Sequence, residues 1–91
     1  MQDGALQITT VVSDGFGENG FVVQCTATGE LVVIDPGNRG DRFQALLAEA
    51  GRAPAGILLT HAHLDHFEGV AVLKRATGAP IWLHAADWWV S

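Results

Sequence analysis

The chain has 91 residues, a formal net charge of −5, and 48 % apolar against 16 % charged residues. This length suits one small domain or part of a larger one, with a core that gives only a thin margin of stability. The five basic residues form no run, which argues against a nucleic-acid partner. No apolar stretch reaches the roughly 18 residues of a membrane-spanning helix, and the N-terminus lacks the features of a secretory signal. We therefore expect a cytoplasmic protein without a membrane partner.

Three strands are predicted in the first part of the chain. The β-branched stretch 6–12 and residues 21–26 are typical of strands, and the continuously apolar stretch 31–34 predicts a third, buried on both faces. Residues 15–20 match G-x-G-x-x-G, but a dinucleotide loop needs a helix directly after it, whereas a strand is predicted here. We expect a hairpin loop and no nucleotide cofactor. The single cysteine, Cys25, is expected to be a small buried hydrophobe.

Helices and strands alternate in the rest of the chain. Apolar residues spaced i, i+3, i+4 and i+7 predict an amphipathic helix over residues 41–50, with Gly51 as its stop. The elements predicted after it are a buried strand over 56–59, a helix over 67–77 ended by Gly78, and a strand over 80–84. This order predicts an α/β (α+β) fold, a mixed β-sheet with helices on one face. The last ten residues hold Trp82, Trp88 and Trp89, which indicates that something covers this apolar end.

Four residues with metal-binding side chains stand between the strand over 56–59 and the helix that follows: His61, His63, Asp65 and His66. Strand ends of this kind are where α/β sheets usually bind ligands. In extended backbone His61 and His63 point to the same side and can converge on one ion, while Asp65 and His66 can serve a neighbouring point. Imidazole nitrogen and carboxylate oxygen are ordinary zinc ligands. The cluster predicts a site for one metal ion or for two.

Three further polar residues have simpler explanations. Asp35 follows the third strand in a strong turn sequence, and it can either cap that turn or take part in the site. His84 stands alone at an apolar strand end, which suits a pocket-wall or core residue. Glu68 falls in the first turn of a helix, where the helix dipole alone accounts for an acidic residue.

The segment from Thr60 to Gly69 resembles the T-H-x-H-x-D-H-x-x-G motif of the metallo-β-lactamase superfamily. Residues 32–37 and 78–84 resemble the family's first motif and the strand after its metal helix. Within the superfamily the chain is most similar to the hydroxyacylglutathione hydrolase (glyoxalase II)-like branch. The resemblance implies one domain over residues 1–91, the N-terminal half of an αββα sandwich.

The resemblance also implies roles for the cluster. His61 and His63 would bind a first metal ion, and Asp65 and His66 a second. Asp65 would in addition orient the nucleophile as the catalytic residue, and Asp35 would brace the metal loop. The metal would be zinc, as one or two ions, with iron or manganese as alternatives.

The family's remaining ligands lie downstream of the resembling region, and neither His84 nor Asp87 matches them. Three hypotheses follow. One is a hydrolase in which metal-bound hydroxide attacks a small-molecule thioester or ester. Another is a non-catalytic metal-binding piece that forms a homodimer or pairs with a second chain supplying the C-terminal half. The third is an iron-dependent oxidoreductase of the same fold, similar to persulfide dioxygenase.

Overall fold

The computed structural model describes residues 5–12, 19–37, 39–60 and 67–83, and every structural statement below concerns these ranges. They contain, in chain order, the strands β1 (Leu6–Val12), β2 (Asn19–Cys25) and β3 (Leu31–Ile34), helix α1 (Gly40–Ala50), strand β4 (Gly56–Leu59), helix α2 (Phe67–Thr77) and strand β5 (Ile81–Leu83). None of the helices described here is long and apolar enough to cross a membrane.

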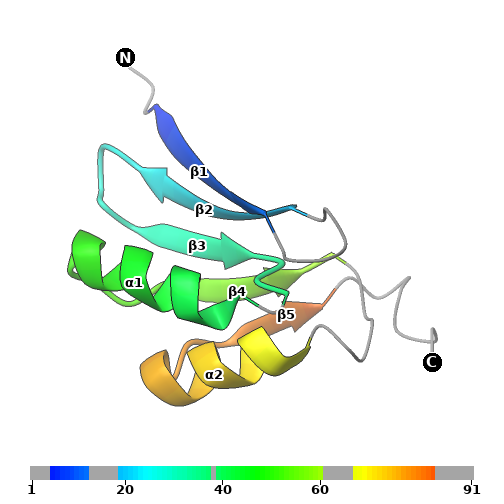
Figure 1. Ribbon diagram of the computed structural model, residues 1–91. Coiled ribbons are helices and arrows are strands. Elements are labelled where there is room, and N and C mark those ends of the chain that lie inside the picture. The colour runs from blue at the N-terminus through cyan, green and yellow to red at the C-terminus, as the bar shows by residue number, and fades with distance from the viewer. Residues whose placement is uncertain (1–4, 13–18, 38, 61–66, 84–91) are drawn as a thin grey trace.

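The strands form one mixed sheet in the order β1-β2-β3-β4-β5. β1, β2 and β3 pair antiparallel, whereas β4 pairs parallel with β3 and β5 parallel with β4. Both helices lie on the same face of this sheet (Figure 1). The predicted fold class is confirmed. The register pairs Val12 with Asn19, so residues 13–18 join two antiparallel strands, and the expected hairpin is confirmed.

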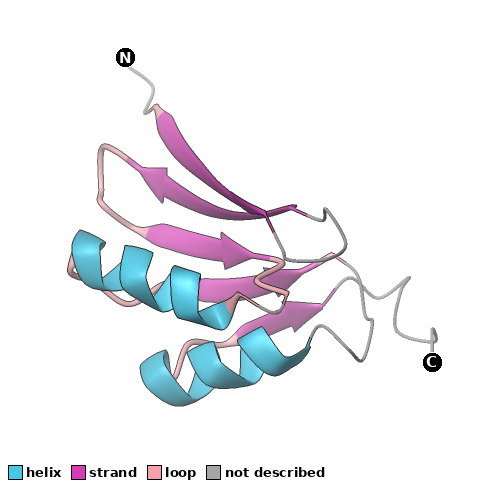
Figure 2. Cartoon of the chain, in the orientation of Figure 1, coloured by secondary structure: helices cyan, strands magenta, loops and turns pink. Residues whose placement is uncertain are grey.

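Glycines end both helices, as the sequence predicts. Gly51 has φ +74° and its N–H donates to the carbonyl of Leu47, which is the left-handed cap that glycine adopts without steric cost. Gly78 has φ +70° directly after α2. Helix α1 begins one residue earlier than predicted, at Gly40. Figure 2 shows the resulting alternation of helix and strand in the second part of the chain.

The helices bury one face of the sheet, which we call the covered face. Phe43 of α1 and Leu73 of α2 are fully buried against Val33 and Ile57 of the central strands. Removing these side chains from water supplies the main stabilising free energy of the fold. Within the part of the chain that the structure describes, the core consists of Val11, Val22, Leu31, Val33, Phe43, Leu47, Ile57, Leu59, Val70, Leu73 and Ala79.

The opposite face, which we call the open face, has no described helix over it (Figures 1 and 2). Each strand places apolar residues on it, and Leu6, Ile8, Val12 and Trp82 are each more than half exposed. The pairing register places on it the apolar residues Leu6, Ile8, Val12, Phe21, Val23, Cys25, Val32, Ile34, Leu58 and Trp82, together with Thr10, Asn19 and Gly56. A largely apolar exposed surface of this kind is typical of a place where another layer or a partner packs.

Two burial predictions are wrong because of this open face. β3 was expected to be buried on both faces, yet Leu31 and Val33 are buried while Val32 and Ile34 are only half-buried. Cys25 is likewise half-buried rather than part of the core. Alternate strand residues point to opposite faces, and within the described residues the helices cover only one of them.

Candidate metal centre

The predicted ligands His61, His63, Asp65 and His66 lie outside the described residues, as do His84 and Asp87. The structure does describe both flanks of the segment 61–66. β4 ends at Leu59 and α2 begins at Phe67. The segment thus joins the carboxyl end of a parallel strand to the start of a helix, where α/β sheets bind ligands.

The turn after β3 lies against the end of β4. The N–H of Asp35 donates to the carbonyl of Leu58 over 2.9 Å, and Pro36 is fully buried. Asp35 has φ +50° and Gly37 has φ +59°, both in the left-handed region, which aspartate tolerates better than most residues and glycine adopts freely. The hydrogen bond to Leu58 and the buried Pro36 hold this turn against the end of β4.

The side chain of Asp35 holds the residue that precedes the cluster. The N–H of Thr60 donates to Asp35 Oδ1 over 2.8 Å, and the Thr60 hydroxyl donates to Asp35 Oδ2. Both carboxylate oxygens therefore accept hydrogen bonds from a residue of the neighbouring strand end. Hydrogen bonds to a charged acceptor are about twice as strong as neutral ones. Asp35 fixes the point at which the chain leaves β4.

The same turn contacts the first turn of α2. The N–H of Gly69 donates to the carbonyl of Gly37 over 2.9 Å. A Cβ at position 69 would lie 2.3 Å from that carbonyl oxygen, far inside any normal contact, so only glycine fits. Asp35 and Gly37 thus hold the chain immediately before residue 61 and three residues after residue 66. The turn brackets the predicted ligand segment at both ends.

A local ion pair stands where the turn leads into α1. Arg39 Nε lies 3.2 Å from Asp41 Oδ1, and the N–H of Arg39 donates to the Pro36 carbonyl. The hydrogen bond from the Arg39 guanidinium lowers the pKa of the Asp41 carboxyl below its usual value. Asp41 is exposed and lies in the first helical turn, where negative charge is also favoured by the helix dipole. These local roles account for Asp41 without a part in metal binding.

The donor set of the segment fits a divalent transition-metal ion. Imidazole suits zinc and iron, and a carboxylate suits zinc and manganese as well. Metal sites also need groups behind the ligands that hold their backbone in place. The bonds from Asp35 to Thr60 and from Gly69 to Gly37 provide this support at both ends of the segment. The described surroundings therefore suit a metal ion held by residues 61–66.

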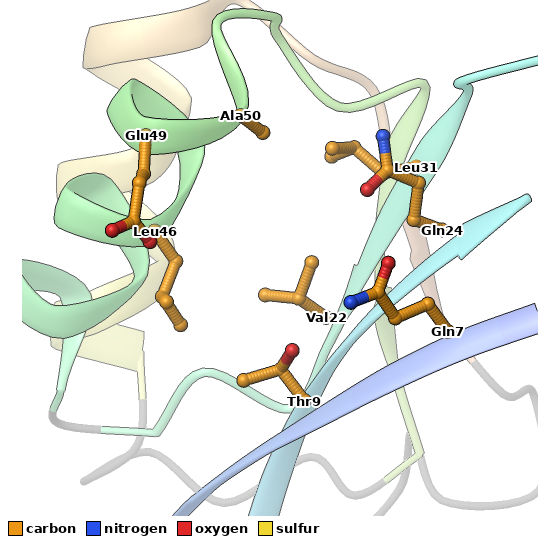
Figure 3. A pocket seen from close by; sticks show the side chains of 8 residues that line it. All are labelled: Gln7, Thr9, Val22, Gln24, Leu31, Leu46, Glu49 and Ala50. Carbon is orange, nitrogen blue, oxygen red and sulfur yellow. The ribbon is translucent and has the colours of Figure 1, made fainter. Parts of the chain in front are cut away.

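A separate hollow of about 180 Å³ lies between α1 and the β1–β2 hairpin (Figure 3). Its lining includes Leu31, the first residue of β3, and Ala50, the last residue of α1. The hollow therefore lies near the start of β3, whereas the turn that contacts Thr60 and Gly69 follows the end of β3. The lining residues are Gln7, Thr9, Val22, Gln24, Leu31, Leu46, Glu49 and Ala50. We assign this hollow no part in the metal centre.

Comparison with known proteins identifies the family. The model of the metallo-beta-lactamase superfamily matches residues 13–88. The chain belongs to the metallo-beta-lactamase superfamily. A hydroxyacylglutathione hydrolase of Cereibacter sphaeroides (strain ATCC 17025) is 43 % identical over 84 residues, covering 90 % of this chain and 31 % of the relative. An exodeoxyribonuclease WalJ of Streptococcus pneumoniae (strain D39) is 32 % identical over 82 residues, covering 87 % of this chain and 30 % of the relative.

A solved structure supports the same fold. The crystal structure of TTHA1623 in a di-iron-bound form has a TM-score of 0.72 and 39 % identity, covering 88 % of this chain and 39 % of that one. The predicted resemblance to the superfamily, and to its glyoxalase II-like branch, is confirmed. The chain spans about 30 % of the length of the curated relatives.

Proposed function

We propose that this chain is the metal-binding half of a metal-dependent hydrolase that acts on a small-molecule thioester or ester. His61 and His63 hold one divalent ion and Asp65 and His66 a second, with zinc as the metal and iron or manganese as alternatives. Such an ion would polarise a carbonyl and lower the pKa of a bound water far enough for hydroxide to form near neutral pH. The observation that carries the proposal is the turn whose Asp35 carboxylate and Gly37 carbonyl hold both flanks of the ligand segment.

The hydrogen bonds of the flanking residues Thr60 and Gly69 would reduce the conformational entropy that the ligand segment loses when it binds a metal ion. Ordering the backbone of one residue costs roughly 1–2 kcal/mol, so a free six-residue loop would lose much of its metal-binding free energy in becoming ordered. Asp35 accepts a hydrogen bond from Thr60 and Gly37 accepts one from Gly69, so the residues that flank the segment are held without a bound ion. Asp35 in this account acts through Thr60 and the loop backbone. Asp65, within the loop, orients the attacking nucleophile.

The open face and the family's downstream ligands point to a second half. We propose that the other sheet of the αββα sandwich covers the open face, supplied by a longer chain, by a second chain or by a second copy. Two features support this: the apolar residues that the open face exposes, and the 31 % share of the hydroxyacylglutathione hydrolase that the chain spans. A cytoplasmic location stays part of the proposal.

A relative solved with two iron ions leaves one competing function open. TTHA1623 has been solved in a di-iron-bound form, and it is 39 % identical to this chain. An iron-dependent oxidoreductase of the same fold is therefore the second candidate. Zinc has no redox chemistry, so a purified chain that retains zinc would exclude the oxidoreductase, whereas iron would suit either candidate.

Thermal melts with and without zinc, followed by a thioester hydrolysis assay, test the proposal. Zinc at about 100 times its Kd should stabilise the chain by about 2.7 kcal/mol, and a chelator should remove this gain. We expect the zinc-loaded 91-residue chain to hydrolyse thioesters slowly or not at all, because the downstream ligands are not among its residues. Equal melting midpoints with zinc and with chelator would contradict the metal site. Turnover at ordinary enzymatic rates that is lost in Asp65→Ala would contradict the need for a second half.

A further inference from the structure

Gly20 of β2 lies against the turn that holds the metal segment. A Cβ built at this position would be 2.2 Å from the carbonyl oxygen of Asp35 and 2.9 Å from both the Ile34 carbonyl oxygen and Phe43 Cζ. Backbone oxygens cannot swing aside as the end of a long side chain can, and Phe43 is fully buried. Gly20 does not have a positive φ, so its backbone conformation does not require glycine. Glycine is needed here because the turn occupies the space that a side chain at position 20 would fill.

Gly40, the first residue of α1, makes a similar contact on the other side. A Cβ there would lie 3.0 Å from Gly69 Cα, 3.1 Å from the Gly69 carbonyl oxygen and 3.2 Å from Val72 Cβ. The missing side chain lets the start of α1 approach the first turn of α2, where Gly69 donates to Gly37.

We propose that Gly20 and Gly40 are positioning residues of the metal centre, an inference that rests on the proposed function. Gly20 sets how closely the turn approaches β2, and so where the Asp35 carboxylate meets Thr60. Gly40 sets the position of Gly69, and so where α2 resumes after the ligand segment. Neither glycine supplies a ligand, yet together they determine the separation of the two ends of residues 61–66.

The test compares the zinc affinity of Gly20→Ala and Gly40→Ala with that of Gly78→Ala. Gly78 is a matched control because it has φ +70° and no atom within 4 Å of its built Cβ. Alanine there destabilises the fold through the backbone without touching the turn. Each Kd is measured by competition with a chromophoric chelator, alongside urea unfolding. We expect Gly20→Ala and Gly40→Ala to bind zinc at least about tenfold more weakly than Gly78→Ala, with the larger loss in Gly20→Ala.

A second readout is the NMR shift of the Thr60 amide proton in the metal-free chain. It should move in Gly20→Ala and stay unchanged in Gly78→Ala, because only the first substitution displaces Asp35. If Gly20→Ala does not fold, Gly40→Ala carries the test through its milder contact. Zinc affinities equal to that of Gly78→Ala would overturn the inference, and so would loss of folding in both variants. Absence of zinc binding by the unsubstituted chain would instead overturn the proposed function, while the Thr60 shift would still test the positioning link.

Discussion

The two faces of the sheet carry similar apolar residues but lie in different environments. On the covered face Val33 and Ile57 are fully buried beneath the helices, whereas on the open face Ile8 is 59 % and Trp82 60 % exposed. Successive residues of a strand point to opposite faces, so two neighbouring valines can differ completely in burial. Apolar residues in a strand thus indicate that a face can be covered. Which face is covered depends on where the helices α1 and α2 pack. Under the proposed function, the second half of the sandwich packs on the open face.

The largest expected effect comes from a matched pair of phenylalanines. Phe43→Ala on the covered face removes a fully buried ring and should lower the free energy of unfolding by about 3–5 kcal/mol, close to the whole stability of a small domain. Phe21→Ala on the half-buried open face should cost roughly half as much or less. Urea unfolding of both variants measures the difference. Equal losses would show that the open face is packed as tightly as the core.

A smaller effect is expected for two adjacent valines of β1. Val11 is 4 % exposed and Val12 is 56 % exposed. Val11→Thr places a hydroxyl in the core and should destabilise the chain by about 1–3 kcal/mol. Val12→Thr should change the free energy of unfolding by no more than about 0.5 kcal/mol, as exposed substitutions usually do. A reversed order of the two losses in a thermal melt would contradict the assignment of the faces.

The smallest effect concerns association through the open face. Sedimentation at micromolar concentration should show the chain as a dimer or larger species, because the exposed apolar residues gain free energy when they are covered. Ile8→Thr should weaken this association roughly fivefold, equivalent to about 1 kcal/mol. Gln7→Thr, at the neighbouring position on the other side of β1, is the control and should leave it unchanged. A wild-type monomer at these concentrations would show that the open face does not drive self-association.

Features that depend on local sequence could be predicted, whereas features that depend on how the elements pack could not. The strands, both helices and the glycines that end them could be predicted, because periodicity and turn chemistry are local properties. The superfamily could be predicted because its ligand motif is continuous in sequence. The burial of only one side of β3 could not be predicted, because its sequence is apolar throughout and does not show which face the helices cover.

Contacts between residues far apart in the sequence also could not be predicted from local patterns. Asp35 bonds to Thr60, 25 residues further along the chain, and this pairing depends on β3 and β4 being neighbours in the sheet. From the sequence Asp35 could equally have capped its own turn. Gly20 likewise looked like the end of a hairpin loop, and its close approach to the Asp35 carbonyl depends on the fold. The metal ligands themselves, His61, His63, Asp65 and His66, remain a prediction.

The most direct test of the central claim is the metal content of the folded chain. Elemental analysis combined with native mass spectrometry, after dialysis against micromolar zinc, should give one or two zinc ions per chain. The double variant His61→Ala/His63→Ala should lose at least one of them, whereas His84→Ala should retain the full content. A wild-type chain that carries no metal, or the same metal content in all three proteins, would contradict the assignment of residues 61–66 as a metal centre.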